Sequence, residues 1–293
     1  MNLLILGASG LVGGNALTYF GQFAAHSVRG THFSYPTEST CYFNTANLND
    51  PANAAVLADF CPDVIMHCGA LTHVDYCEAH PDESYQKTVD STRNVLVLAQ
   101  RFDAKVVYIS TDYVFNGENG PYAEDSPTEP VCVYGRHKLT AEQLVQNSGL
   151  PFIILRITNV YGSEQRAKNF VARLLHQMHG GESINASLPA DQYATPINAL
   201  DIARATDQLL AHSHTGIYHL ASTDYLNRFQ LADRIVSKFG YEKATLVPIT
   251  TASLAQPAPR PLNGGLLAHK FLQAFPTFRF TTIDQFLANN PYA

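Results

Sequence analysis

The sequence lacks the features that mark nucleic-acid-binding, membrane and secreted proteins. Only 15% of its 293 residues are charged and the formal net charge is −6, so no excess of positive charge indicates a nucleic-acid partner. No apolar run is long enough to span a membrane, and the opening segment MNLLILGASG lacks the basic stretch of a signal peptide. We therefore expect a cytoplasmic globular protein of one or two domains.

Paired cysteines are also missing, because the five cysteines are odd in number and scattered along the chain. Such a set favours reduced thiols over a disulfide framework. One local group of side chains has the chemistry of metal ligands and comprises His67, Cys68, His73, Cys77 and His80. Their spacing matches no standard zinc motif, so we expect no metal there and interpret the segment as a strand end followed by a polar loop.

What is present begins with a short apolar run, residues 2–6, and with glycines at spacing three directly after it. An apolar segment that can be helical follows, over residues 11–20. In this setting glycines let the backbone approach the pyrophosphate of a dinucleotide at the helix N-terminus. A tight turn without a ligand is the simpler alternative, but the position after a strand favours dinucleotide binding. The predicted phosphate loop comprises Gly7, Ser9, Gly10, Leu11, Val12 and Gly13.

Acidic residues are absent before Glu38. A cofactor without a 2′-phosphate usually meets an Asp or Glu about 20 residues after the glycines. Arg29 lies instead at the expected end of the second strand, residues 26–31, and favours NADPH as the cofactor. NADH remains open, because Arg29 can equally be a surface charge. Asn44 begins a turn that we expect near the adenine.

Apolar strands and amphipathic helices alternate up to Arg156. This alternation predicts an α/β fold with a doubly wound, Rossmann-type parallel sheet. The expected strands are 2–6, 26–31, 64–67, 106–109, 152–155 and 217–220, and the expected helices are 11–20, 51–60, 81–102, 132–147, 169–179, 199–212, 228–239 and one near 265–271. We assign residues 1–156, with a return segment near 197–220, to a dinucleotide-binding domain. A smaller C-terminal substrate lobe takes 157–196 and 221–293.

Ligands of such sheets bind beyond the carboxyl ends of the strands, so residues at those ends are expected to converge. Cys68, Gly69 and Ala70 follow one predicted strand, and their small size lets a cofactor pass close to the backbone. Ser110 and Thr111 follow another.

Tyr134 and Lys138 stand four residues apart in a predicted helix, which places both side chains on one face. An ammonium near a phenol favours the phenolate and lowers the tyrosine pKa. Such a tyrosine can exchange a proton with a substrate oxygen near neutral pH. The pair alone is a weak signal, but the Ser110-Thr111 turn and the glycine loop make a catalytic pair the better interpretation.

With these motifs the chain resembles an extended short-chain dehydrogenase/reductase of the dTDP-4-dehydrorhamnose reductase family. The matching segments occur in family order from residue 1 to about residue 270. They are HCGALTHVDYCE (67–78), STDYVFNG (110–117), PYAEDSPTEP, VYGRHKLTAE, DQYATP (191–196) and PRPLNGGLL (259–267).

The resemblance implies an enzyme that uses NADPH to reduce the C4 ketone of a nucleotide-linked 6-deoxy-hexulose, with a homodimer as one assembly. It makes Tyr134 the general acid and Lys138 its partner, which also contacts the nicotinamide ribose. It also implies that the Thr111 hydroxyl holds the substrate oxygen. Asn44 stands where relatives often have Asp. The implied substrate contacts are Thr72, Val74, Asp112, Tyr113, Gln192 and Arg260.

Two other functions remain open. An epimerase or dehydratase is disfavoured, because such dehydratases carry Thr-Asp-Glu where this chain has Thr111-Asp112-Tyr113, and a tyrosine is a poor substitute for the glutamate. A dinucleotide-binding regulatory subunit, resembling the partner of a methionine adenosyltransferase, is the non-enzymatic alternative.

Overall fold

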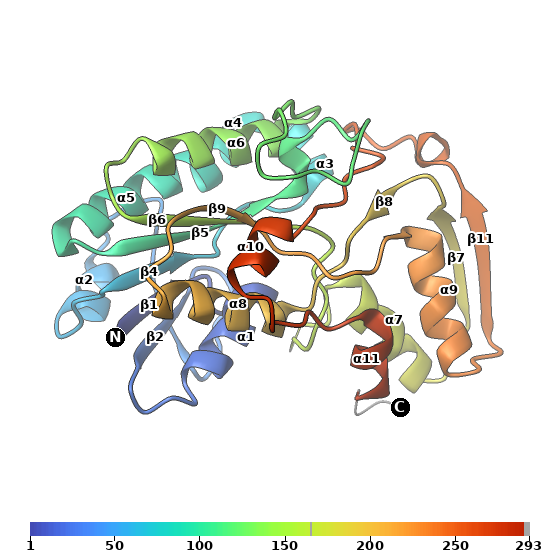
Figure 1. Cartoon of the computed structure of the whole chain (residues 1–293), viewed down its shortest axis with the longest axis horizontal. Helices are drawn as coiled ribbons and strands as arrows, with labels where there is room; N and C mark the ends of the chain where they lie inside the picture. Colours follow the sequence, from blue (N-terminus) through green and yellow to red (C-terminus); the bar gives the residue numbers. More distant parts are fainter. Residues whose placement is uncertain (165, 290–293) are drawn as a thin grey trace.

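The structure is a computed structural model that describes residues 1–164 and 166–289. Its centre is a seven-stranded sheet in which every neighbouring pair is parallel (Figure 1). Within the described chain, no helix is both long and apolar enough to cross a membrane. The strands in spatial order are β3 (Thr40–Tyr42), β2 (Ser27–His32), β1 (Asn2–Leu6), β4 (Val64–His67), β5 (Lys105–Thr111), β6 (Phe152–Ile157) and β9 (Gly216–His219).

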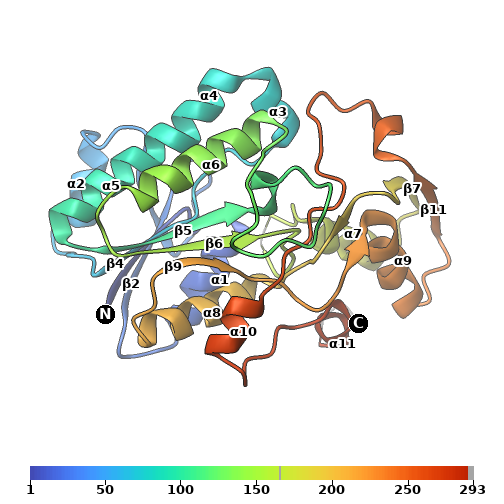
Figure 2. The same cartoon turned by 45° about the horizontal axis from the view of Figure 1, so that its top comes forward.

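Helices cover both faces of the sheet because alternate residues of its buried strands point to opposite sides. Leu3 and Ile5 of β1 pack with α1 (Leu11–Phe20) and α8 (Ala199–Ala211), whereas Leu4 packs with the opposite layer. Figure 2 shows the two layers on either side of the sheet. The doubly wound parallel sheet is therefore confirmed. The opposite layer contains α2 (Pro51–Leu57), α4 (Pro81–Tyr85), the π-helical turn η1 (Gln86–Asp90), α5 (Ser91–Phe102) and α6 (Val133–Gln146).

A smaller group of elements lies beyond the carboxyl ends of the strands (Figure 1). Its core is built by apolar residues of two helices and of the last helix of the described chain, packed with a parallel pair of strands that are far apart in sequence. A second, antiparallel pair of two-residue strands lies nearer the sheet. The elements are α7 (Phe170–His179), β7 (Ile184–Pro189), β8 (Tyr193–Ala194), β10 (Leu226–Asn227), α9 (Arg228–Lys238) and β11 (Ala244–Ile249).

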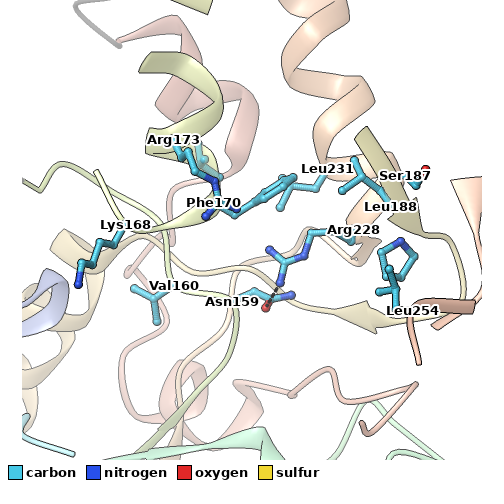
Figure 3. A pocket seen from close by; sticks show the side chains of 12 residues that line it. Asn159, Val160, Lys168, Phe170, Arg173, Ser187, Leu188, Arg228, Leu231 and Leu254 are labelled. Atoms are coloured by element: carbon cyan, nitrogen blue, oxygen red, sulfur yellow. Dashed lines mark hydrogen bonds between the residues drawn. The ribbon is translucent and has the colours of Figure 1, made fainter. Parts of the chain in front are cut away.

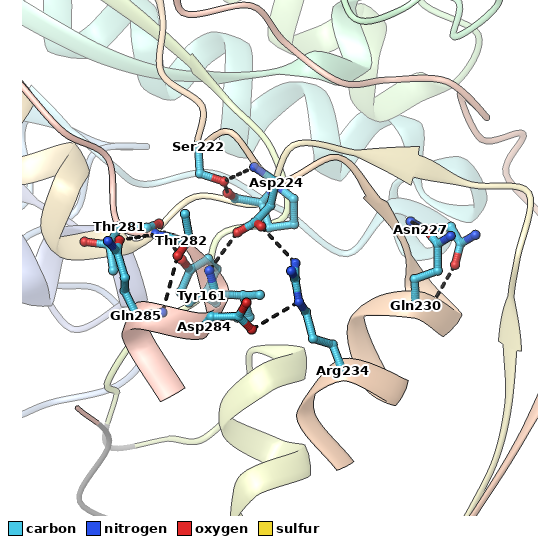
Figure 4. Close-up of polar contacts among 12 residues, drawn as sticks. Tyr161, Ser222, Asp224, Asn227, Gln230, Arg234, Thr281, Thr282, Asp284 and Gln285 are labelled. Carbon is cyan, nitrogen blue, oxygen red and sulfur yellow. Dashed lines mark hydrogen bonds and ion pairs between the residues drawn. The ribbon is translucent and has the colours of Figure 1, made fainter. Parts of the chain in front are cut away.

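Charged side chains attach the last helix, α11 (Ile283–Ala288), to α9 (Figure 4). The Asp224 carboxylate accepts hydrogen bonds from Arg234 at 3.0 Å and from the backbone N–H of Ile283 at 2.7 Å. Arg234 also pairs with Asp284 at 3.1 Å, and the Tyr161 hydroxyl donates to the Thr281 carbonyl at 2.9 Å.

The segment 258–267 is extended and lies between the sheet and the smaller group. The Tyr122 N–H donates to the Gly265 carbonyl at 2.7 Å, and the Tyr193 N–H donates to the Leu262 carbonyl at 2.6 Å. The prediction of a helix near 265–271 is therefore wrong over its first residues, because these backbone groups bond to distant segments instead. The helix there, α10, begins only at His269 and ends at Ala274.

Most other predicted elements are confirmed to within one to three residues at each end. The expected helix 81–102 is interrupted by the π-helical turn η1. Missed elements are β3, the short strands of the smaller group, α11, the 3-10 helices η2 (Asp112–Val114) and η3 (Thr251–Leu254), and α3 (Val74–Ala79), which replaces part of the expected polar loop after residue 67.

A buried ion pair fixes α6 on the sheet. Glu142 of α6 accepts hydrogen bonds from Arg156 of β6 at 2.7 and 3.0 Å, and both side chains are at least 96% buried. The Arg156 guanidinium also lies over the Phe115 ring, with Cζ 5.2 Å from its centroid. Because Lys138 is one helical turn before Glu142, this pair also positions the predicted catalytic face of α6.

We predict that Glu142→Leu lowers the free energy of unfolding by about 3–5 kcal/mol, because Arg156 then stays buried without a counter-charge. The double variant Glu142→Leu/Arg156→Met should recover most of that loss. Glu83→Gln, which removes an exposed pair with Lys87, is the control and should cost less than about 1 kcal/mol. Urea unfolding gives all three values, and equal costs for the two glutamate variants would contradict the prediction.

Candidate functional site

The glycine turn brings the ends of β1 and β4 together. An ideal Cβ on Gly7 would lie 3.0 Å from the Gly69 nitrogen, and one on Gly13 would lie 2.5 Å from the Gly7 carbonyl oxygen. Gly7 has φ +83°, a left-handed conformation that suits glycine. Neither position therefore tolerates a side chain.

The N-terminus of α1 is suited to an anion. Its N-cap is Gly10, with no side-chain cap and no acidic residue in the first turn, so the first N–H groups have no side-chain acceptor. An ideal Cβ on Gly10 meets only the Gly7 carbonyl oxygen, at 3.4 Å. A phosphate group fits this arrangement. Ser9, Leu11 and Val12 belong to the same half-buried turn.

Lys138 lies beneath the end of β5. Its Nζ donates to the Ile109 carbonyl at 2.6 Å and lies 4.1 Å from the Tyr108 ring centroid. Burial lowers the pKa of Lys138 to about 7, while the negative charges of Glu142 and Cys68 would act in the opposite direction. Burial likewise raises the pKa of Cys68, at the end of β4, to about 12.

The expectation that Lys138 lowers the pKa of Tyr134 is wrong in this structure. Burial raises the pKa of Tyr134 above its usual value, and a hydrogen bond with Thr111 only partly opposes the rise. The ammonium donates to the backbone of Ile109. Tyr134 is therefore protonated at neutral pH, which is the form that a general acid requires.

The end of β5 carries buried polar groups beside Tyr134. Thr111 Oγ1 donates to Asp112 at 3.1 Å, and Thr158 Oγ1 donates to the other carboxylate oxygen at 2.7 Å. Burial raises the pKa of Asp112 to about 6, against the effect of these hydrogen bonds. Ser110 Oγ is buried and has no partner among the described residues.

Tyr113 connects this strand end to the smaller group of elements. Its ring meets the Tyr134 ring edge to face, with centroids 5.5 Å apart. Burial raises the pKa of Tyr113, and the positive charges of Arg260 and Arg228 act against that rise, so both cations lie within electrostatic range. The Arg260 guanidinium also pairs with Asp75 of α3 at 2.8 Å.

Arg228 lines a pocket of about 460 Å³ (Figure 3). Three cationic side chains line it, Lys168, Arg173 and Arg228, and none of them belongs to an ion pair of the described residues. Arg228 donates to the side chain of Asn159 at 3.2 Å, and its Cζ lies 4.7 Å from the Phe170 ring centroid. Burial lowers the pKa of Arg228, and the nearby charge of Arg173 acts in the same direction.

Sequence reasoning missed this pocket, because its cations come from separate segments with no motif of their own. None of the predicted substrate residues belongs to its lining. Thr72 is exposed before α3, and Val74 is the first residue of that helix. Gln192 directly precedes β8. The next residue, Tyr193, accepts a hydrogen bond from the backbone of Gly264, and an ideal Cβ on Gly264 would lie 2.6 Å from the Asp112 carboxylate.

Two predicted cofactor contacts have other partners. Arg29 is the third residue of β2 rather than its end, and its guanidinium donates to the Val56 carbonyl at 2.5 Å and lies 4.6 Å from the Phe60 centroid. The prediction that it meets a 2′-phosphate is therefore wrong. Asn44 follows β3 at the correct edge, but its side chain holds the turn by bonding to Ala46 and Asp50.

The histidines and cysteines between residues 67 and 80 are dispersed in the structure. His67 is buried against Tyr108, His73 caps α3, and the His80 ring stacks on Tyr76 at 4.0 Å. Across residues 1–164 and 166–289, no group of three or more His, Cys, Asp or Glu side chains could hold a metal ion.

The parallel sheet, with its glycine turn after β1 and Tyr134 and Lys138 beside β5, has the architecture of the extended short-chain dehydrogenases/reductases. The family profile "RmlD substrate binding domain" matches residues 1–286, and the chain belongs to that family.

Similar proteins include a reductase, a methionine adenosyltransferase subunit and a polysaccharide biosynthesis protein. A dTDP-4-dehydrorhamnose reductase of Bacillus anthracis, solved in complex with NADP, has a TM-score of 0.85 at 26% identity over 98% of this chain and 97% of its own. The beta subunit of methionine adenosyltransferase 2 from Bos taurus is 32% identical over 271 residues, 90% of this chain and 79% of that protein. The spore coat polysaccharide biosynthesis protein SpsK of Bacillus subtilis is 32% identical over 213 residues, 72% and 73% of the two chains.

The phosphate loop can be tested with two glycines that differ in surroundings. Gly10→Val should leave thermal stability near that of the parent, because the backbone is extended there and the nearest atom is 3.4 Å from the new Cβ. The same change should abolish NADPH binding in a fluorescence titration. Gly13→Ala should instead destabilise the fold. Unchanged NADPH affinity in a folded Gly10→Val variant would reject this site.

Asp112 should make stability depend on pH. Because its folded pKa is raised, the folded state binds a proton more tightly, so stability falls as pH rises from about 4 to about 6. We predict that the free energy of unfolding, measured with urea, falls between about pH 5 and pH 8 by about 1 kcal/mol more in the parent than in Asp112→Asn. Parallel stability curves for the two proteins would contradict the raised pKa.

Proposed function

We propose that the protein catalyses the NADP(H)-dependent reduction of the C4 ketone of a nucleotide-linked 6-deoxy-hexulose. The observation that carries the proposal is the position of Tyr113, which touches Tyr134 on one side and lies within electrostatic range of Arg228 on the other. Arg228, one of the three cations that line the pocket, is therefore linked through Tyr113 to the phenol that would donate the proton. Family membership and the NADP complex of the Bacillus anthracis reductase support the same function.

The cationic pocket suits the diphosphate of a nucleotide sugar. Lys168, Arg173 and Arg228 can neutralise the two phosphates, and arginine presents paired N–H donors to a phosphate. The Phe170 ring, which lies against Arg228, supplies an apolar surface in the same wall. Binding the nucleotide there would hold the sugar toward Tyr113 and Tyr134.

We assign the dinucleotide to the glycine turn that follows β1. The uncapped N-terminus of α1 would hold its pyrophosphate, and the unpartnered Ser110 Oγ lies at the strand end nearest the reacting groups. Lys138 would donate to the ribose by exchanging or sharing its hydrogen bond to Ile109. A bound nicotinamide supplies the hydride.

The protein's own groups would act on the substrate oxygen. As negative charge develops there, the Tyr134 hydroxyl donates a hydrogen bond to it and then gives up its proton. The Thr111 hydroxyl would donate a second hydrogen bond by turning its single proton from Asp112 to the substrate oxygen. Lys138, which bonds to the Ile109 backbone and does not lower the pKa of Tyr134 here, would act through the cofactor ribose. Because the pKa of Lys138 is about 7, its charge is lost as pH rises through that value.

A regulatory subunit is the second candidate, favoured by the identity with the beta subunit of methionine adenosyltransferase 2. It predicts binding of a dinucleotide and of a methionine adenosyltransferase without ketone reduction. The dehydratase alternative has less support, because burial raises the pKa of Tyr113 and the Asp112 carboxylate is held by two threonines.

The test is NADPH oxidation with a panel of nucleotide-linked 4-keto sugars. Tyr134→Phe should lower single-turnover rates by about 10²–10⁴-fold, because the ring and its packing remain while the proton is lost. NADPH affinity should stay near that of the parent. Lys138→Met should also slow turnover and weaken NADPH binding.

Tyr241→Phe is the matched control, since this tyrosine lies in the smaller group and its hydroxyl donates to the Glu182 carbonyl. It should retain the parent rate. If Tyr134→Phe also retains that rate, the phenol is not the acid. If the parent reduces no ketone but co-purifies with a methionine adenosyltransferase, the regulatory function replaces the enzymatic one.

A further inference from the structure

An arginine distant in sequence lies at the end of β2, where Arg29 was expected. The Cζ of Arg166, in the connection between β6 and α7, lies 4.6 Å from the ring centroid of Tyr35. Tyr35 is in the loop that directly follows β2. In parallel sheets that bind dinucleotides, the end of the second strand is where the adenosine ribose is recognised.

The connection that carries Arg166 is held against the first helix. The Asn15 side chain of α1 donates to the Ser163 carbonyl at 2.9 Å. The Asn169 side chain, which caps α7, donates to the Gly162 carbonyl at 3.0 Å and to the Glu164 carboxylate at 2.9 Å. Arg166 therefore lies between the β2 end and the helix that begins at the phosphate loop.

The charge of Arg166 has no counter-ion among the described residues. Glu164, the nearest carboxylate in sequence, accepts from the side chain and from the backbone N–H of Asn169. A guanidinium that stacks on an aromatic ring still presents its N–H edge to a phosphate. The adjoining strand β2 carries no carboxylate that would repel one.

We propose that Arg166, supported by the Tyr35 ring, binds the 2′-phosphate of NADP(H) and sets the preference over NADH. The proposal rests on the dinucleotide site of the proposed function. It assigns cofactor choice to a residue from the connection to the smaller group rather than to one on β2. The neutral 2′-hydroxyl of NADH offers this cation no charge to pair with.

Isothermal titration with two small probes separates this contact from catalysis. The probes are adenosine 2′,5′-bisphosphate and adenosine 5′-monophosphate, which differ only in the 2′-phosphate. The parent should bind the bisphosphate more tightly. Arg166→Ala should weaken the bisphosphate by about 10- to 100-fold, as expected for a lost charge-assisted contact, and the monophosphate by no more than about threefold. Arg166→Lys should retain part of the preference for the bisphosphate over the monophosphate.

Arg101→Ala is the matched control, because Arg101 also lies over an aromatic ring, that of Phe102, but at the far end of α5. It should change neither affinity. Equal effects of Arg166→Ala on the two probes, or no effect on either, would overturn the proposal while leaving the dinucleotide site intact. A parent that binds neither the probes nor NADPH would overturn both this proposal and the proposed function. Circular dichroism establishes that each variant is folded.

Discussion

The candidate site depends on the parallel register that ends β1, β4 and β5 at one edge of the sheet. At that edge the Gly7 and Gly69 backbones approach so closely that a side chain on Gly7 has no room. The amides of α1 and the polar ends of β4 and β5 are thereby brought next to each other. Lys138, which bonds to β5, and Tyr113, which directly follows β5, are positioned by the same strand end.

Placing polar groups at such an edge has an electrostatic cost that the surrounding fold must offset. Burial lowers the pKa of Lys138 to about 7 and raises that of Asp112 to about 6, because it disfavours the charged form of each side chain. The Glu142–Arg156 ion pair and the packing of α6 keep these groups in place. Shifted titratable groups gathered in this way are typical of functional sites.

One connection borders both halves of the proposed site. Between β6 and α7 it contacts α1 through Ser163, places Arg166 on Tyr35, and supplies Lys168 to the cationic pocket. Cofactor and substrate would therefore contact opposite ends of a single short segment.

The sequence allowed the sheet and the Tyr134 region to be predicted because their signals are local. Buried strands read as apolar runs, and Tyr134 and Lys138 are one helical turn apart. Arg29 was misplaced because β2 extends to His32, which leaves the arginine in mid-strand, facing Phe60. A strand boundary is uncertain by a few residues from sequence alone, and that error decides whether a side chain reaches the edge.

Other features depend on contacts that no local pattern encodes. The parallel pair β7 and β11 joins residues about 60 positions apart, and its strands are half exposed. Arg166, Arg173 and Arg228 acquire their significance only from what folding places beside them. The pKa of Tyr134 was predicted in the wrong direction, because burial raises it and the ammonium of Lys138 bonds to the backbone instead.

The central claim is that this protein transfers a hydride to a sugar ketone and delivers a proton to its oxygen. The most direct test uses NADPH deuterated at C4 of the nicotinamide, on each face in turn, with a nucleotide-linked 4-keto sugar and mass analysis of the product. The account predicts that one of the two labelled cofactors adds a single deuterium to the carbonyl carbon, with one NADPH consumed per product. Product without deuterium from either cofactor, or no product on a broad panel of such sugars, would contradict it.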